Sequence, residues 1–248
     1  MISNSTKGAT PAGARSEQEA ATRVRAMFGR VAHRYDLANH LLSFNIDRSW
    51  RARTVRRVRP ILERPGARVL DICCGTGDLV VALQRVCRGP VLGADFCHPM
   101  LVAARAKVAR TPSLLFEADA LRLPVRTGSL DLVTVAFGFR NLANYEDGLR
   151  EMRRVLKPGG MAAILEFSQP SNALFGAVYG FYSHRALPWI GGLITGNRDA
   201  YRYLPESIRR FPNAPRLAED MRRAGFTEVS YQRFTGGSVA LHTGAAAL

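Results

Sequence analysis

The segment Val69–Leu79, which reads VLDICCGTGDL, limits the folds open to this chain more than any other. An apolar run of strand-forming residues leads into a turn that holds Gly75 and Gly77, and a helical pattern starts at Asp78. Because glycine has no Cβ, the backbone there can turn tightly and approach a ligand closely. The free N–H groups at the start of the helix attract an anion. The segment therefore predicts the strand, turn and helix of a nucleotide-binding α/β fold.

Short β-rich runs alternate with helical stretches over the rest of the chain, which favours βαβ units and a parallel sheet. The expected strands are Arg68–Ile72, Val91–Ala94, Leu115–Glu117, Leu130–Ala136 and Met161–Phe167. The expected helices are Asp78–Arg88, Pro99–Arg110, Tyr145–Leu156 and Pro215–Ala224. Lys157–Gly160 is expected to stop a helix and form a turn. With a closing hairpin of Val229–Phe234 and Ser238–Leu241, we expect a mostly parallel seven-stranded sheet with helices on both faces.

The 248 residues suit one α/β domain with additions. Residues 1–21 are rich in small and polar side chains and are expected to form a disordered tail. Residues 22–61 have an amphipathic helical pattern, which predicts a helical N-terminal cap on a domain that spans 22–248. Residues 172–211 predict an inserted helical segment on the substrate side, before the hairpin.

Three acidic residues follow successive strands and point to one kind of ligand. Cys73 stands where a dinucleotide-binding turn has its first glycine, which argues against a dinucleotide. S-adenosylmethionine instead has an amino acid end, with a carboxylate for the amides of the turn and an ammonium for Asp71. Asp95 lies 24 residues after Asp71, close to the ~20 residues usual for an acid that binds ribose hydroxyls. Asp119 and the Ala120 amide come after the third strand, where they can bind adenine.

Each acid also has an ordinary alternative role when it is considered alone. The turn after Asp71 can be a plain βα turn, Asp95 can cap the next helix, and Asp119 can cap its own loop. The position of all three at the carboxyl ends of neighbouring strands favours a cofactor crevice, because such ends meet at one edge of a sheet.

The residues after the fourth strand indicate what accepts the methyl group. Enzymes that methylate the exocyclic amines of bases tend to have an Asn/Asp-Pro-Pro-aromatic turn here, and this chain has Arg140 and Asn141 instead. An Arg and an Asn suit an oxygen-rich acceptor such as a phenol or phenolate. Pairing of Arg140 with a surface carboxylate is the alternative interpretation.

Motifs through most of the chain resemble the UbiE/MenG family of quinone-biosynthesis C-methyltransferases. The resembling residues are Met27-Phe28, Arg34–Leu37, Asp71–Leu79, Phe137–Asn141, Leu156–Gly160, Leu165–Ser168, Leu187-Pro188, Tyr201–Leu204, Gly225-Phe226 and Val239–His242. The resemblance implies a class I, Rossmann-like methyltransferase that carries a methyl group from S-adenosylmethionine to a ring carbon of a polyprenylated quinol. The adjacent Cys73 and Cys74 lack the C-x2-C spacing of zinc sites, and no His cluster accompanies them, so no metal is expected. The resemblance also implies cofactor contacts from Thr76, Asp95, Asp119 and Ala120, whereas Ala136 lacks the side-chain hydrogen bond of the Ser often found there.

The resemblance implies that Arg140 and Asn141 act at the quinol oxygen. Arg140 is too basic to accept a proton, so its role is expected to be electrostatic, with water relaying the proton. The reserve candidates are His33, Tyr35, His184 and Tyr201, and His184-Arg185 departs from the family pattern. The pair Cys73–Cys74 favours a demethylmenaquinol substrate, with the benzoquinol of the ubiquinone pathway as the alternative.

The formal net charge is +15, and many arginines lie close together between Arg48 and Arg68. This charge suits an anionic membrane surface or RNA, and an arginine-rich composition with solvated faces explains it equally well. The missing base-amine turn argues against an RNA methyltransferase, and the intact Arg140–Asn141 pair argues against a regulator without catalysis. With no apparent signal peptide or membrane span, we expect a cytoplasmic protein, with contact to the inner face of the membrane and a homodimer left open.

Overall fold

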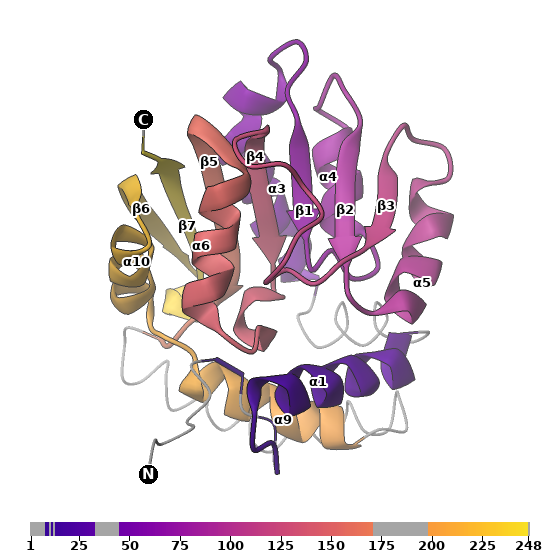
Figure 1. Ribbon diagram of the computed structural model, residues 1–248, viewed down its shortest axis with the longest axis vertical. Coiled ribbons are helices and arrows are strands. Elements are labelled where there is room, and N and C mark those ends of the chain that lie inside the picture. Colours follow the sequence, from indigo (N-terminus) through magenta and orange to yellow (C-terminus); the bar gives the residue numbers. More distant parts are fainter. Residues whose placement is uncertain (1–7, 10, 12, 33–44, 171–197, 248) are drawn as a thin grey trace.

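The computed structural model describes all residues except 1–7, 10, 12, 33–44, 171–197 and 248. Its centre is one seven-stranded sheet with the order β3-β2-β1-β4-β5-β7-β6 (Figure 1). The strands are β1 (Val69–Ile72), β2 (Val91–Asp95), β3 (Leu114–Glu117), β4 (Leu130–Ala136), β5 (Leu156–Phe167), β6 (Phe226–Phe234) and β7 (Val239–Ala246). The first five strands are parallel, and β7 pairs antiparallel with both β5 and β6. The expected fold class and closing hairpin are confirmed.

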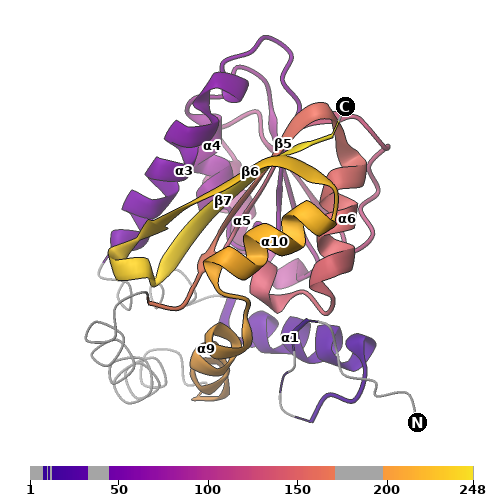
Figure 2. The same ribbon diagram turned by 90° about the vertical axis from the view of Figure 1, so that its left-hand side faces the viewer.

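Helices cover both faces of the sheet (Figures 1 and 2). They are α1 (Glu17–Val31), α3 (Ile46–Leu62), α4 (Asp78–Gln84), α5 (His98–Val108), α6 (Tyr145–Val155), α9 (Arg198–Arg210) and α10 (Ala214–Arg223). Successive side chains of a strand point to opposite faces, so Val69 joins the core under α3 and α4 while Leu70 joins the core under α6. The central strands are therefore apolar on both sides, as βαβ architecture requires.

Helix α1 begins earlier than the sequence predicts, and the expected boundary of a disordered tail at residue 21 is wrong. The Ser16 side chain accepts a hydrogen bond from the Glu19 N–H and caps the helix, so the helical pattern starts at Glu17. Upstream of the helix, Ala9 is buried, and its N–H donates to the Leu142 carbonyl at 2.7 Å. Small residues therefore pack this part of the chain against the domain.

Lys157–Gly160 does not form the free turn expected after α6. The helix stops as expected, at Val155, but the chain enters β5 directly at Leu156. The pairing with β4 then skips from Leu130↔Leu156 to Leu132↔Met161, so the four residues form an irregularity within the strand. Gly159 has φ of 73°, which explains why a glycine is suited to this bulge.

Helices α1 and α9 lie across the carboxyl edge of the parallel strands (Figure 1). Of the expected insertion at residues 172–211, the described part is α9 and the residues that follow it, and residues 172–197 lie outside the described ranges. No helix among the described residues is both long and apolar enough to cross a membrane. The carboxyl edge is thus the place where the predicted site residues and the added helices meet.

Candidate active site

The turn after β1 has an unusual backbone that Asp95 holds in place. Cys73, Gly75 and Gly77 all have positive φ, of 50°, 54° and 85°. The two oxygens of the Asp95 carboxylate accept the N–H groups of Gly75 and Cys97, each at 2.8 Å. Burial raises the pKa of Asp95, and these N–H groups oppose that rise. Asp95 ends β2 as predicted, and it ties the glycine turn to the next strand.

A second turn of this kind follows β4 and touches the first. Phe137 has φ of 60°, and a Cβ on Gly138 would lie 2.4 Å from the Cβ of Cys73. Because that distance is far below van der Waals contact, the two turns can meet only if residue 138 has no side chain. The glycine at 138 therefore lets the turn after β4 lie directly against the turn after β1.

Asp71 does not end its strand, contrary to the sequence interpretation, because β1 continues to Ile72. Its carboxylate is buried between neighbouring strands and accepts a hydrogen bond from the Thr134 hydroxyl at 2.6 Å. Burial raises the pKa of Asp71 to about 7, against the opposing effect of that hydrogen bond. Asp71 thus changes its charge close to neutral pH.

Asp119 borders a cavity of about 340 Å³ at the ends of β2 and β3. The cavity is lined by Gln18, Ala21, Thr22, Arg25, Phe96, Glu117, Ala118 and Asp119. Asp119 is exposed and accepts the Leu121 N–H at 2.9 Å, while Ala120 beside it is buried. Helix α1 supplies one wall of the cavity, and sequence reasoning did not foresee that role.

Thr76 is buried in the glycine turn, and its hydroxyl accepts a hydrogen bond from Lys107 at 3.2 Å. Lys107 also pairs with Asp78 at the start of α4, and Arg51 of α3 lies 3.4 Å from the same carboxylate. These contacts brace the start of α4 against α3 and α5. The side chain of Thr76 is thereby tied to the α5 side of the turn.

Four carboxylates surround Cys73 at the carboxyl edge. Burial is the main reason that the pKa of the Cys73 thiol lies well above its usual value, and Asp95, Asp71, Asp119 and Glu166 raise it further. The structure therefore brings the three predicted acids to one place and adds Glu166 to them. A crevice lined with carboxylates fits a ligand that has a positively charged sulfur and an ammonium group.

Arg140 lies in the turn after β4, in the short helix η2 (Phe139–Asn141), and is buried with an ion-pair partner. Its Nη1 donates to Glu166 Oε1 at 2.8 Å and to the Phe137 carbonyl at 2.6 Å, and its backbone N–H donates to Glu166 Oε2 at 3.1 Å. The guanidinium carbon also lies 5.1 Å from the centre of the Phe167 ring. Because Arg140 and Glu166 are only 4% and 1% exposed, pairing with a surface carboxylate is wrong.

Two tyrosines complete the polar cluster around η2. The Tyr145 hydroxyl donates to the Arg140 carbonyl at 2.9 Å, and the Tyr203 hydroxyl of α9 donates to Asn141 Oδ1 at 3.2 Å. Burial raises the pKa of Tyr203 to about 12, so it remains a neutral donor. Sequence reasoning missed Glu166, Tyr145 and Tyr203, although a lone acid in the apolar strand β5 was a signal for Glu166.

A sequence model described as the ubiE/COQ5 methyltransferase family matches residues 16–246. The chain belongs to this family. It is 50% identical to the demethylmenaquinone methyltransferase of Thermus thermophilus over 221 aligned residues. This alignment covers 88% of this chain and 99% of that protein. It is 45% identical over 235 residues to the ubiquinone/menaquinone biosynthesis C-methyltransferase UbiE of Azotobacter vinelandii, over 92% of this chain and 91% of that protein.

A solved SAM-dependent methyltransferase from Thermotoga maritima has the same fold. Its TM-score is 0.65 at 18% identity, and the match covers 90% of this chain and 99% of that one. The chain is therefore a class I methyltransferase of the ubiE/COQ5 family, and S-adenosylmethionine is its methyl donor. This donor agrees with the negative crevice described above.

Some predicted residues of this methyltransferase cannot be placed in the site. His33, Tyr35 and His184 lie outside the described residues, and the side chain of Tyr201 in α9 is not described either. Ala136 is the last residue of β4. Within the described ranges, no three His, Cys, Asp or Glu side chains are grouped so that they could hold a metal ion.

Proposed function

We propose that this methyltransferase converts a 2-demethylmenaquinol to menaquinol by transferring a methyl group to a ring carbon of the quinol. The observation that carries the proposal is the Arg140–Asn141 turn, which lies against the cofactor turn through Gly138 and Cys73. The name of the relative from Thermus thermophilus supports the same reaction. The substrate is an electron-rich phenol, and both side chains of the turn are suited to a phenolic oxygen.

The cofactor residues of the proposal are those around the glycine turn. We assign the backbone of Gly75, Thr76 and Gly77, just before α4, to the carboxylate of S-adenosylmethionine, because the N-terminal end of a helix favours an anion. Asp95 is assigned to the ribose; its oxygens already accept two N–H groups, but each has a second lone pair for a hydroxyl. Asp119 and Ala120 are assigned to adenine binding. Asp71 is assigned an electrostatic role, in which its negative charge favours the ammonium group of S-adenosylmethionine.

The residues at the acceptor side position the quinol and stabilise charge on it. S-adenosylmethionine supplies a methyl group on a positively charged sulfur, and transfer leaves S-adenosylhomocysteine. The chain must hold the reacting ring carbon ~3–3.5 Å from that methyl group and in line with it. Arg140 has a pKa above ~12, so it stabilises a phenolate and does not remove a proton.

Asn141 has a defined orientation for this role. Because its Oδ1 accepts from Tyr203, its Nδ2 hydrogens can be donated to a quinol oxygen. As the new carbon–carbon bond forms, the carbon–sulfur bond breaks and the ring carbon loses its proton to water. This order leaves both side chains unchanged at the end of the reaction.

The decisive experiment compares acceptors with labelled S-adenosylmethionine. Purified protein should methylate a demethylmenaquinol, and Arg140→Ala should abolish most turnover while cofactor affinity stays unchanged. Turnover by Arg140→Ala at the wild-type rate would remove Arg140 from the proposal. Because relatives at 45% identity are named for both ubiquinone and menaquinone biosynthesis, the ubiquinone-pathway benzoquinol is tested beside it, and total RNA serves as the unrelated acceptor. Mass spectrometry of quinones from cells that lack the protein identifies the natural substrate.

We also propose that the enzyme works at the cytoplasmic face of a membrane. A polyprenyl chain keeps such a quinol in the bilayer, so the ring must be collected at the surface. Cell fractionation tests this location, and sedimentation tests whether the chain forms a homodimer.

A further inference from the structure

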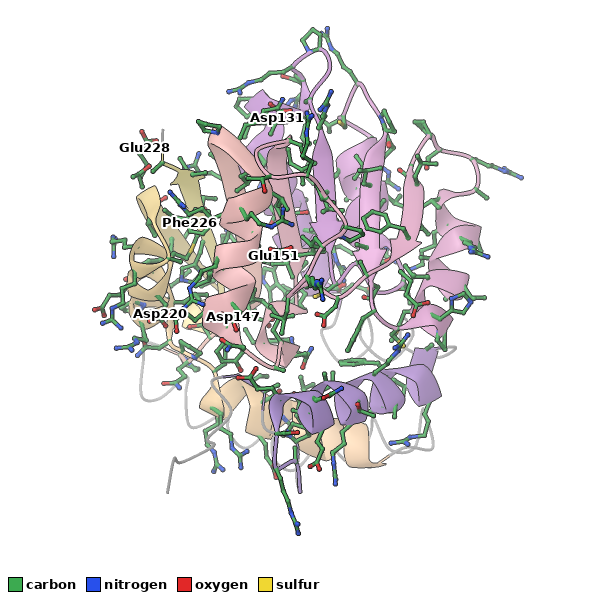
Figure 3. All side chains as sticks on the ribbon, in the orientation of Figure 1. Asp131, Asp147, Glu151, Asp220, Phe226 and Glu228 are labelled. Atoms are coloured by element: carbon green, nitrogen blue, oxygen red, sulfur yellow. The ribbon has the colours of Figure 1, made fainter. Side chains whose placement is uncertain are left out.

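The arginines of this chain are divided unequally between the two sides of the sheet. On the side of α6 and α10, several exposed arginines are paired with carboxylates, as Arg150 is with Glu146 and Asp147 and Arg223 is with Glu219, whereas Arg153 and Arg222 bond backbone carbonyls. Figure 3 also labels Glu151 and Asp220 on that side, which pair with Arg154 and Arg216. Positive charge on this side is therefore largely neutralised.

The outer surface of α3 and the residues that follow it differ in this respect. Its exposed arginines are Arg48, Arg53, Arg56, Arg57, Arg59, Arg64 and Arg68. Among the described residues, Arg59 has a carboxylate partner, Glu63, and none of the others lies within ion-pair distance of one. We refer to these arginines as the α3 arginine surface. An arginine-rich composition alone does not explain why one side is neutralised and the other is not.

The position of the α3 arginine surface relates it to the active site. Trp50 in the first turns of α3 packs against Phe137 and Phe167, with ring centres 5.8 and 6.4 Å apart. These two phenylalanines follow or end β4 and β5, so α3 starts at the carboxyl edge and runs along the outside of the sheet (Figure 2). Ile46, the first residue of α3, is an apolar side chain that is 40% exposed at this end.

We infer that the α3 arginine surface docks on an anionic phospholipid bilayer, with Ile46 at the end that enters the lipid headgroups. Arginine binds lipid phosphates with several N–H donors, and an apolar side chain beside a basic helix face adds to membrane binding. A nucleic acid fits less well, since single-stranded binding uses aromatic side chains among the basic ones and the exposed face of α3 has none. The choice of a bilayer rests on the proposed polyprenylated substrate.

The test is flotation of the full chain with vesicles of phosphatidylglycerol and phosphatidylcholine, compared with phosphatidylcholine alone. Arg56→Glu/Arg64→Glu should lower binding to the anionic vesicles by about tenfold or more, and salt should weaken wild-type binding. The matched control is Arg126→Glu/Arg222→Glu, which changes charge equally on exposed arginines of the α6–α10 side. Circular dichroism and thermal melting show that both variants are folded.

The inference is supported if the α3 variant no longer binds anionic vesicles and the control variant still binds them. It is overturned if both variants lose binding equally, if neither does, or if wild type shows no preference for anionic lipid. Loss of RNA binding without loss of vesicle binding would also overturn it and would assign the surface to RNA. A methylation assay with a short-tailed soluble quinol separates the membrane proposal from the proposed function. The α3 variant should methylate this quinol at the wild-type rate, because no membrane is needed. If none of the proteins methylates it, the proposed function is contradicted and the flotation result still stands.

Discussion

Gly138→Ala is the substitution for which the structure allows the most direct prediction. Gly138 has φ of −110°, which alanine adopts without strain, so the effect of the new methyl group is steric. Its Cβ would lie 2.4 Å from the Cβ of Cys73, 3.3 Å from the Cys73 carbonyl oxygen and 3.4 Å from the Cys73 sulfur. Carbon atoms pack ~3.5–4.0 Å apart, so the turns after β1 and β4 must separate by about 1 Å.

The expected cost of Gly138→Ala is about 2 kcal/mol of unfolding free energy, which is typical of an overpacked core. For a chain of 248 residues this corresponds to a fall of roughly 4–8 °C in the melting temperature. Since the turn that moves is the one that Asp95 ties down, S-adenosylmethionine affinity should fall as well, by about tenfold for each ~1.4 kcal/mol of displacement cost.

A double-mutant cycle with Cys73→Gly checks the reasoning. Glycine at 73 removes the Cβ that clashes and also suits the φ of 50° there. Cys73→Gly/Gly138→Ala should therefore recover most of the loss, with a coupling energy of about 1–2 kcal/mol. The control is Gly89→Ala, whose Cβ would make one ordinary contact at 3.6 Å and should be nearly neutral. Thermal melting and titration calorimetry compare the four variants with wild type, and a Gly138→Ala variant that melts like wild type would refute the steric argument.

Three further predictions concern buried charges. Glu166→Gln leaves the Arg140 guanidinium without its counter-charge and should lower the free energy of unfolding by about 3 kcal/mol, measured by melting. The double variant Glu166→Gln/Arg140→Met should regain this stability, but a methylation assay should show that its turnover is not restored. Burial lowers the pKa of His242 to about 4, so wild-type stability should fall as pH drops from 6.5 towards 4, by at most about 3 kcal/mol, and His242→Gln should flatten that profile in urea titrations. Burial raises the pKa of Asp71 to about 7, so ionisation of its carboxyl destabilises the fold as pH rises from 4 through 7. Asp71→Asn should therefore melt at a higher temperature than wild type at pH 8 and bind S-adenosylmethionine more weakly. Equal melting temperatures at pH 8 would contradict this prediction.

The sequence predicted those parts of the fold that depend on local patterns. Apolar runs predict the carboxyl ends of the five parallel strands to within one residue, because buried strands leave a clear signal between turns. The start of β5 was placed at Met161, whereas the strand begins at Leu156. The start of α1 was missed although its cap is local, since the Ser16 side chain accepts the N–H of Glu19 three residues later. The packing of Ala9 on Leu142, in contrast, depends on a contact distant in sequence. The bulge at Lys157–Gly160 was missed because a Lys-Pro-Gly-Gly sequence is equally compatible with a free turn. Its pairing with β4 is decided by the folded sheet.

The candidate site divides in the same way. Asp95 and Asp119 could be located because the carboxyl ends of parallel strands meet at one edge, which is a rule of topology. Glu166 and Tyr203 lie 26 and 62 residues from their partners in η2, so these contacts exist only in the folded chain. Tyr145 is five residues from its partner Arg140, but nothing in the local sequence pattern indicates that its hydroxyl contacts that carbonyl. In the sequence, the buried ion pair is visible only as one charged residue, Glu166, within an apolar strand. The sequence does not show which arginine pairs with it.

The contact between residues 73 and 138 relates the two halves of the reaction. The turn after β1 carries the backbone proposed for the cofactor, and the turn after β4 carries Arg140 and Asn141 for the acceptor. Because Cys73 fills the space in which a side chain at 138 would lie, its size fixes how closely the two turns approach. A larger residue at 73 would push the acceptor turn away from the methyl group, and a glycine would leave that distance less defined. The cysteine that argued against a dinucleotide thus sets the spacing that methyl transfer depends on.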